Sequence, residues 1–559
     1  MEVARLNFAV FENEGEKRLF RQNVRNKKTG SLPRGRGFHH TNRVVRPFLR
    51  TKIHYILASV VLLSPGRSIM AQIATGPAAQ AEARVDATPA RPATASGNPL
   101  FPVNPAPAYN GTKEFSIIVN SVKMNRLNGK DTWAEPQANR TRVMEQLAGF
   151  IPRIVATDKW GGRLDHTETA TGFFYTKKVG DRWWAIDPAG HEYFNVALVA
   201  LSPGTSPDGK AALTRLYGDK PNWMKKTHAM LLQYGFNSAG AWSDVDSIRA
   251  SAFQATHPLS YTVILNFMAE YGKKRGGLHD TPGHAGFPND TIFVFDPEFP
   301  QFVEESAKQI RKYADDPNLF GYFSDNELPF SRKNLDGYLA LPHNEPGYIA
   351  ARKWMDEHKG TAPADELKKQ FLEYEANLYY SIVSAALRRN DPNHMYLGSR
   401  NTGEGRLDEE MFRVLGKYAD AISINYYDSW TPDTKLMAMW ERESGKPEII
   451  TEWYVKASDS GMPNTTGAGW LVATQAERGE FYQNFVLGLI ASRSIIGWQW
   501  FKYQDNDPND PHAELSNKDA NKGIVNTKLQ IYEPLVQRMR QLNPNTYALA
   551  DYFDHAPRP

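Results

Sequence analysis

The chain has 559 residues, of which 41% are hydrophobic and 12% aromatic, and this composition excludes a fibrous or disordered protein. Its length suits one large domain of ~250–400 residues with a smaller appendage. The chain has no cysteine, which excludes disulfides, thiolate metal sites and a cysteine nucleophile. The net charge of +4 divides into +10 for residues 1–71 and −6 for residues 72–559. This charge distribution argues against a nucleic-acid-binding surface on the folded part.

The N-terminal segment predicts an export signal followed by a linker. A basic stretch precedes the short apolar run 53–64, and small residues around Ala71 follow it, which is typical of a signal peptide cleaved near that alanine. The alternative interpretation of the apolar run 53–64 is a short buried helix. We therefore expect a secreted or periplasmic protein with no membrane attachment after cleavage of residues 1–71. Residues 72–108 are rich in alanine and proline and predict a linker.

Residues 109–190 predict a small β-rich region. A strand is expected at 116–122, and residues 172–194 have the pattern of antiparallel strands. Turns are expected at 180–181 and 188–190, where glycine, aspartate and proline gather.

Residues 191–545 predict an α/β fold, a (β/α)8 TIM barrel that follows the small N-terminal β-rich appendage. Eight short apolar runs alternate with helical patterns, which is the order of such a barrel. A doubly wound sheet is the alternative, but no glycine-rich phosphate loop follows an early strand. The expected strands are 194–201, 236–242, 262–267, 319–323, 395–399, 421–426, 448–452 and 495–501. Amphipathic stretches at 302–314, 364–389 and 476–492 predict helices.

Two glutamates stand at the carboxyl ends of expected barrel strands. Glu327 follows the fourth apolar run and Glu452 ends the seventh. Barrel enzymes place their chemistry at these strand ends. Glycoside hydrolysis needs two carboxyl groups that flank the scissile bond, one of them protonated near neutral pH. Either glutamate alone could be a helix cap or an ion-pair partner, but the pair predicts a glycoside hydrolase.

The motifs around these glutamates resemble clan A of the glycoside hydrolases, and more narrowly the family 50 β-agarases. The resemblance covers about residues 170–540, and Asp-Asn-Glu together with the Gly-Ser-Arg strand is its most specific part. Strand seven departs from the expected pattern, with Thr-Glu-Trp in place of Ser-Glu-Phe. The matching segments are Gly172–Phe174, Asp181–His191, Tyr234–Asp244, Gly321–Leu328, Asp391–Arg400, Ile422–Tyr427 and Gln475–Arg478.

The resemblance implies Glu327 as general acid/base and Glu452 as nucleophile. It further implies retention of configuration and a β-linked galactan substrate, such as agarose or its oligosaccharides, attacked from chain ends. Asn326 would bind the sugar 2-hydroxyl, and Asp244 lies in a matching motif. Another β-linked polysaccharide remains an alternative substrate, and a non-catalytic, exported carbohydrate-binding barrel is the alternative from a different class.

Other residues are predicted from their positions at strand ends. Arg400 could orient the nucleophile by a charge-assisted bond. Asn425 and Tyr426 end the sixth expected strand and are candidates for substrate binding, and Tyr426 could donate to Glu452. Three tryptophans are candidate stacking platforms for sugar rings, and alternation places the last two on one side of their strand. These tryptophans are Trp242, Trp498 and Trp500.

No cofactor and no metal is expected. No histidine pair has zinc-protease spacing, and no nucleophile elbow or phosphate loop is present. The oxygen-rich loop 505–510 could bind calcium, although a solvated loop is the simpler interpretation. The expected partner is a polysaccharide or oligosaccharide substrate.

Overall fold

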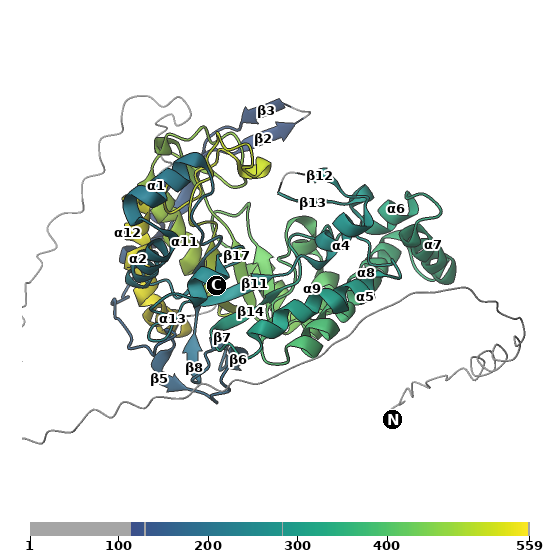
Figure 1. The fold of residues 1–559 in the computed structure, drawn as a ribbon, viewed down its shortest axis with the longest axis horizontal. Coiled ribbons are helices and arrows are strands. Elements are labelled where there is room, and N and C mark those ends of the chain that lie inside the picture. Colours follow the sequence, from purple (N-terminus) through teal and green to yellow (C-terminus); the bar gives the residue numbers. More distant parts are fainter. Residues whose placement is uncertain (1–112, 128–129, 282, 557–559) are drawn as a thin grey trace, which may run out of the picture. The chain divides into compact units, whose positions relative to one another are not determined.

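The computed structural model describes residues 113–127, 130–281 and 283–556 (Figure 1). The predicted leader 1–71 and linker 72–108 lie outside these ranges. Within the described ranges, no helix has both the length and the apolar character needed to cross a membrane.

An eight-stranded parallel sheet forms the centre of the protein, and all eight predicted strands are confirmed. Its strand order is β15-β14-β11-β10-β9-β20-β17-β16, so each strand lies beside its neighbour in the predicted series. The strands are β9 (Asn195–Leu198), β10 (Ser238–Ala239), β11 (Ser260–Ile264), β14 (Leu319–Phe323), β15 (Met395–Tyr396), β16 (Ile422–Asn425), β17 (Glu448–Glu452) and β20 (Ile495–Trp500).

Backbone hydrogen bonds join the two edges of this sheet. The amide of Asn401 donates to the carbonyl of Ser423 at 2.9 Å, and the amide of Asn425 donates to the carbonyl of Asn401 at 2.9 Å. The amide of Ser423 also donates to the carbonyl of Leu397 at 3.0 Å. The segment after β15 thereby pairs with β16, which is consistent with a TIM-like barrel.

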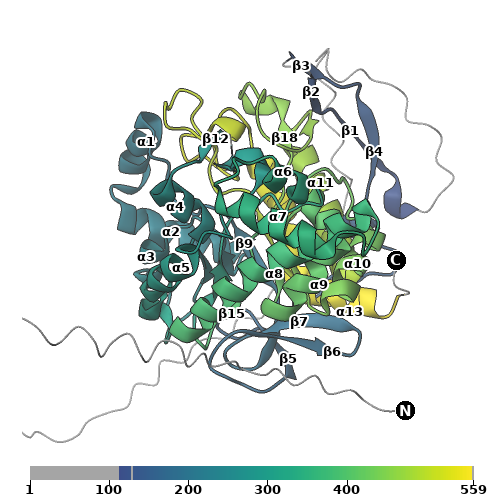
Figure 2. The same ribbon diagram turned by 90° about the vertical axis from the view of Figure 1, so that its right-hand side faces the viewer.

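Helices surround the parallel strands (Figures 1 and 2). The predicted helical stretches are confirmed as α5, continued by a 3-10 helix over Lys308–Tyr313, and as α8 and α11. Helix α11 begins with a capping box, in which Thr474 and Glu477 each satisfy a backbone amide of the other. The α-helices are α1 (Pro207–Tyr217), α2 (Lys220–Gln233), α3 (Val245–Arg249), α4 (Phe267–Arg275), α5 (Phe299–Ala307), α6 (Asn334–Leu339), α7 (Pro346–His358), α8 (Ala364–Asn390), α9 (Glu409–Tyr418), α10 (Thr434–Ser444), α11 (Gln475–Ser492), α12 (Glu533–Leu542) and α13 (Thr546–Asp554).

A four-stranded antiparallel sheet, in the order β5-β8-β7-β6, precedes the barrel and lies below it in Figure 1. It confirms the antiparallel strands expected over 172–194, with turns at 180–181 and 188–190. Arg163 and Arg182 of this sheet are buried and form ion pairs with Asp551 and Asp554 of α13, which fasten the sheet to the end of the chain. Its strands are β5 (Arg163–Thr167), β6 (Tyr175–Val179), β7 (Arg182–Ile186) and β8 (His191–Tyr193).

Smaller strand pairs complete the described structure. The strand expected at 116–122 is confirmed as β1, which pairs antiparallel with β4. The domain boundaries near residues 109, 190 and 545 stay predictions. The remaining strands are β1 (Ile117–Ser121), β2 (Met124–Leu127), β3 (Lys130–Trp133), β4 (Gln137–Thr141), β12 (His279–Thr281), β13 (His284–Gly286), β18 (Lys456–Ala457) and β19 (Leu471–Val472).

Candidate active site

The two predicted glutamates line one cavity of about 660 Å³ at the carboxyl ends of the barrel strands. Glu327 follows β14, and Glu452 is the last residue of β17. These strands are not adjacent in the sheet, so the barrel is what brings the two carboxyl groups to a common space.

Glu327 is held in a largely buried environment. The side-chain amide of Asn425 donates to its Oε1 at 2.8 Å, and the Nδ1 atom of His284 lies 3.9 Å from Oε2. Burial raises the pKa of the Glu327 carboxyl to about 7, and the negative charge of Glu452 adds to this rise. A carboxyl group that keeps its proton near neutral pH can act as a general acid.

Glu452 accepts hydrogen bonds on both carboxylate oxygens. The guanidinium group of Arg400 donates to Oε1, and the hydroxyl of Tyr427 donates to Oε2 at 2.8 Å. Donors of this kind stabilise the ionised form of a carboxylate. The two glutamates therefore lie in contrasting environments: an amide contacts the buried Glu327, and a guanidinium group and a phenolic hydroxyl bind Glu452.

Arg400 connects most of the predicted site. Its Nε atom donates to Oδ1 of Asn326 at 2.8 Å, while its terminal nitrogen reaches Glu452. The guanidinium carbon also lies 4.6 Å from the centroid of the Trp242 ring. Arg400 is fully buried, so this arrangement is fixed from several sides.

Three residues of the site have left-handed backbone conformations. Trp242, Glu327 and Arg400 follow different strands and have φ angles of 57°, 53° and 55°. Such conformations are unfavourable for residues other than glycine and gather at functional sites. Trp242 and Glu327 line the cavity from separate strand ends, and Arg400 lies behind it against Asn326 and Glu452.

Trp242 lies where two cavities meet. It lines the cavity of the glutamates and a second cavity of about 800 Å³, and 41% of its surface is exposed. The two cavities also share Asn326, His284 and Glu514. The site is therefore an elongated cleft, with an accessible indole ring at its middle.

Tyr427 makes the contact that was expected of Tyr426, so that prediction was wrong. The hydroxyl of Tyr426 accepts a hydrogen bond from the amide of Asp433 at 2.8 Å, and its ring packs against Trp440. Side chains alternate between the faces of a strand, so Asn425 and Tyr427 share one face and Tyr426 has the other. Because side chains alternate along a strand, the position of Asn425 could have identified Tyr427 as the tyrosine on the same face.

Trp498 and Trp500 are not stacking platforms, because neither has any exposed surface. They lie on the same side of β20, as expected, but that side faces the helices. The indole of Trp498 donates to the hydroxyl of Tyr482 on α11 at 3.0 Å, and that of Trp500 donates to the carbonyl of Lys522 at 2.9 Å. Gln499, between them, points inward and donates to Asn195 of β9 at 3.2 Å.

Asp244 serves as the N-terminal cap of α3 and does not line either cavity of the cleft. Its carboxylate accepts hydrogen bonds from the amide and hydroxyl of Ser247, at 3.2 and 2.7 Å, and forms an ion pair with Lys220. These partners occupy the oxygens that a substrate would need.

Asp505 likewise uses its carboxylate within the protein, which disfavours the calcium interpretation of loop 505–510. Oδ1 accepts from the amides of Lys522 and Gly523 at 2.7 and 2.6 Å. Oδ2 accepts from Asn521 and from the hydroxyl of Tyr532 at 3.0 and 2.7 Å. The carboxylate thus fastens the loop after β20 to the segment before α12.

Several cleft residues were not identified from the sequence. Most of them lie on loops, and the others lie in the short strand β13 and in 3-10 helices over Gly403–Leu407 and Leu515–Asn517, where no periodicity indicates which side chains face the cavity. These residues are His284, Thr402, Arg406, Tyr427, Tyr454, Phe501, Lys502, Asn506, Glu514 and Asn517.

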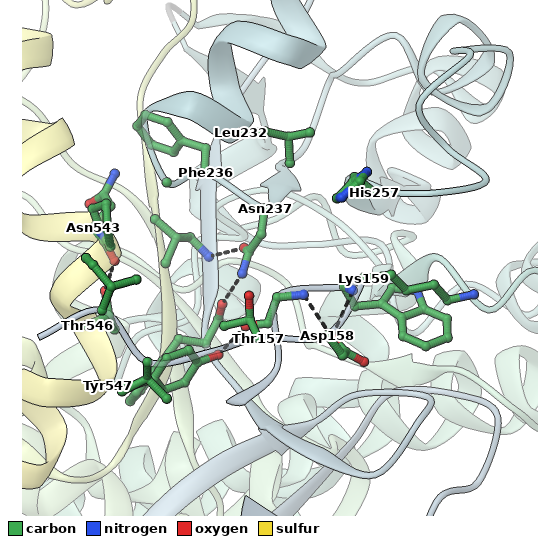
Figure 3. Close-up of a pocket in the computed structure, with 18 residues that line it drawn as sticks. Thr157, Asp158, Lys159, Leu232, Phe236, Asn237, His257, Asn543, Thr546 and Tyr547 are labelled. Carbon is green, nitrogen blue, oxygen red and sulfur yellow. Dashed lines mark hydrogen bonds between the residues drawn. The ribbon is translucent and has the colours of Figure 1, made fainter. Parts of the chain in front are cut away.

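A separate cavity of about 290 Å³ lies where β9 and β10 begin, and neither catalytic candidate lines it (Figure 3). Apolar side chains such as Leu232 and Phe236 form much of its wall. Asn237 already hydrogen-bonds the backbone of Val196 and Phe194. This cavity offers no pair of acids for hydrolysis.

Comparisons with known proteins find β-agarases among the similar sequences. β-Agarase B of Vibrio sp. (strain JT0107) is 24% identical over 486 residues, which cover 70% of this chain and 50% of that protein. β-Agarase A of the same strain is 29% identical over 414 residues, covering 64% of this chain and 40% of that protein. The chain is homologous to β-agarases. It spans about half the length, or less, of these curated relatives, and no family model matches it.

Solved structures share the fold. The crystal structure of BpGH50 aligns with a TM-score of 0.67 and 29% identity, covering 78% of this chain and 96% of that one. The structure of an exo-β-agarase aligns with a TM-score of 0.57 and 21% identity, covering 71% of this chain and 68% of that one.

The raised pKa of Glu327 depends in part on the charge of Glu452, so Glu452→Gln should lower it toward the ordinary value of about 4.3. A carbon-13 titration of labelled glutamate side chains would measure the shift, with the Glu327 signal assigned by its loss in Glu327→Gln. Glu514→Gln, which neutralises an exposed glutamate of the same cleft, is the control. An unchanged Glu327 pKa in Glu452→Gln would contradict the proposed coupling.

Proposed function

We propose that this protein is a retaining glycoside hydrolase of the TIM-barrel clan A that acts on agarose or agaro-oligosaccharides. The observation that carries the proposal is the pair Glu327 and Glu452 in one cleft, in contrasting environments, on a chain homologous to β-agarases. No step of this reaction requires a cofactor.

Glu327 is the proposed acid and Glu452 the proposed nucleophile. In the first step the Glu452 carboxylate attacks the anomeric carbon, while Glu327 gives its proton to the departing glycosidic oxygen. In the second step Glu327 removes a proton from water, which attacks the same carbon and releases Glu452. Two inversions give net retention of configuration.

The surrounding residues fit these roles. Arg400 and Tyr427 hold the Glu452 carboxylate in place. Oδ1 of Asn326 accepts from Arg400, which leaves its side-chain NH2 group as a donor for the 2-hydroxyl of the sugar. That bond strengthens as the transition state forms.

Release of disaccharides from chain ends and export from the cytoplasm belong to the same proposal. The exo mode is supported by the resemblance and by fold similarity to a structure described as an exo-β-agarase. Export is supported by the predicted leader over residues 1–71, since a polymer as large as agarose must be degraded outside the cell.

The first test is hydrolysis of agarose and neoagaro-oligosaccharides by the purified protein, with other β-glycans in parallel. We expect one disaccharide from agarose, released with retained configuration, as read by mass spectrometry and anomeric NMR. Activity confined to another glycan would overturn the agarase assignment and leave the hydrolase mechanism. Binding without cleavage of any glycan would favour the non-catalytic alternative.

The two glutamates should differ in how their variants behave. Glu327→Gln should lower kcat about 10²–10⁴-fold, the usual contribution of a general acid. Glu452→Ala should lose turnover and recover it with azide, giving a glycosyl azide of inverted configuration, because azide replaces the missing nucleophile. Full wild-type turnover in either variant would remove that residue from the mechanism, with Glu514→Gln as the control for a cleft charge.

The tryptophans should separate binding from stability. Trp242→Ala should raise KM about tenfold, the effect of losing roughly 1.4 kcal/mol of contact with the sugar, without lowering the melting temperature. Trp498→Phe should lower the melting temperature and leave KM unchanged, because Trp498 is buried against α11. The reverse pattern would contradict the assignment of Trp242 as the platform.

A further inference from the structure

Three potential metal ligands converge in the sheet that precedes the barrel, away from the cleft. Asp158 lies in the turn before β5, Asp187 follows β7, and His191 begins β8. Nδ1 of His191 lies 3.3 Å from Oδ2 of Asp158 and 3.8 Å from Oδ1 of Asp187. One ligand atom from each of the three residues lies within 4.8 Å of the others.

Backbone amides hold both carboxylates in position. Oδ1 of Asp158 accepts from three successive amides, those of Trp160, Gly161 and Gly162, at 2.9–3.0 Å. Oδ1 of Asp187 accepts from the amides of Ala189 and His191 at 2.9 and 3.0 Å. The backbone therefore fixes each aspartate through its Oδ1, and Oδ2 of Asp158 lies beside Nδ1 of His191.

The Oδ2 atom of Asp187 indicates a ligand independently of the clustering of the three residues. Asp187 is completely buried, and this oxygen has no hydrogen-bond donor among the described residues. No lysine or arginine of the described structure pairs with Asp158 or Asp187, for which His191 is the ion-pair partner. A buried carboxylate oxygen without a donor is costly unless a proton or a cation satisfies it.

Gly162 packs closely beside this oxygen. A Cβ atom on Gly162 would lie 2.0 Å from Oδ2 of Asp187 and 2.7 Å from the Cβ of His191, so only glycine fits there. Burial and the charge of Asp158 raise the pKa of Asp187 to about 7, so a shared proton is the competing way to relieve the repulsion.

The spacing of the ligand atoms fits a small metal ion. In a tetrahedral zinc site with bonds of about 2.0–2.1 Å, neighbouring ligand atoms lie about 3.3 Å apart. The separation of the His191 and Asp158 ligand atoms, 3.3 Å, matches this spacing. A shared proton would join only the two carboxylates and leave His191 hydrogen-bonded to Asp158, whereas a metal ion would bind all three residues.

We propose that Asp158, Asp187 and His191 bind a divalent transition metal, with zinc favoured by two carboxylate oxygens and one imidazole nitrogen. Water supplies the fourth ligand. The ion cross-links the turn 157–162 to the turn between β7 and β8 and is structural. Asp158 also lines the separate cavity of about 290 Å³ where β9 and β10 begin, so the site is partly accessible (Figure 3).

The test uses the untagged full chain, stripped with chelator and dialysed. Titration with ZnCl₂ followed by calorimetry should give one equivalent bound, and saturation should raise the melting temperature by several degrees. Mass spectrometry of the protein as purified should find about one metal ion per chain. Hydrolysis below the melting temperature should be unchanged by chelation, so this test is independent of the glycosidase assignment.

Variants distinguish this site from surface histidines. Asp187→Asn and His191→Gln should each abolish the binding of one zinc ion per chain. The control His512→Gln, at an exposed histidine elsewhere, should still bind one zinc ion. Wild-type protein that binds no zinc or manganese, and whose melting temperature neither ion changes, would overturn the proposal and leave a shared proton. Undiminished zinc binding by a folded Asp187→Asn variant would overturn it as well.

Discussion

The buried guanidinium group of Arg400 is the interaction on which the site depends. It joins the end of the segment after β15 to Asn326 beside β14 and to Glu452 on β17, and it lies against the ring of Trp242 after β10. Four strand ends are thereby related through one planar group. A buried cation is stable only when it is paired, and the carboxylate of Glu452 supplies that pairing. The same bond positions the proposed nucleophile, so one contact serves both the packing of the strand ends and the proposed chemistry.

The sequence predicts the barrel strands and the two glutamates well, because both depend on local patterns. Each strand is a short apolar run between helical periods, and each glutamate follows such a run. Alternation also placed Trp498 and Trp500 correctly on a common side. It could not say which side, because a barrel strand is apolar on both faces and the choice is made by packing against α11.

The errors in the site have a common physical origin. Tyr426 and Asp244 have suitable chemistry near strand ends, but their polar groups are satisfied by the chain itself, through the amide of Asp433 and through Ser247 with Lys220. Neither arrangement has a local signature. The loop residues of the cleft, such as Lys502 and Glu514, were missed because loop conformation is set by long-range contacts that no periodic pattern encodes.

The anchoring of Asp505 bears on how such a cleft could be redesigned. Its carboxylate ties the beginning of the loop after β20 to residues 521–523 and to Tyr532, so both ends of the loop are held by one side chain. The residues between, which include Asn506, Glu514 and Asn517, face the cleft. Asp519 of the same loop accepts hydrogen bonds from Thr465 and Thr466, so a replacement loop that retains Asp505, Asp519, Asn521 and Tyr532 would change the groups that face the cleft while the barrel stays the same.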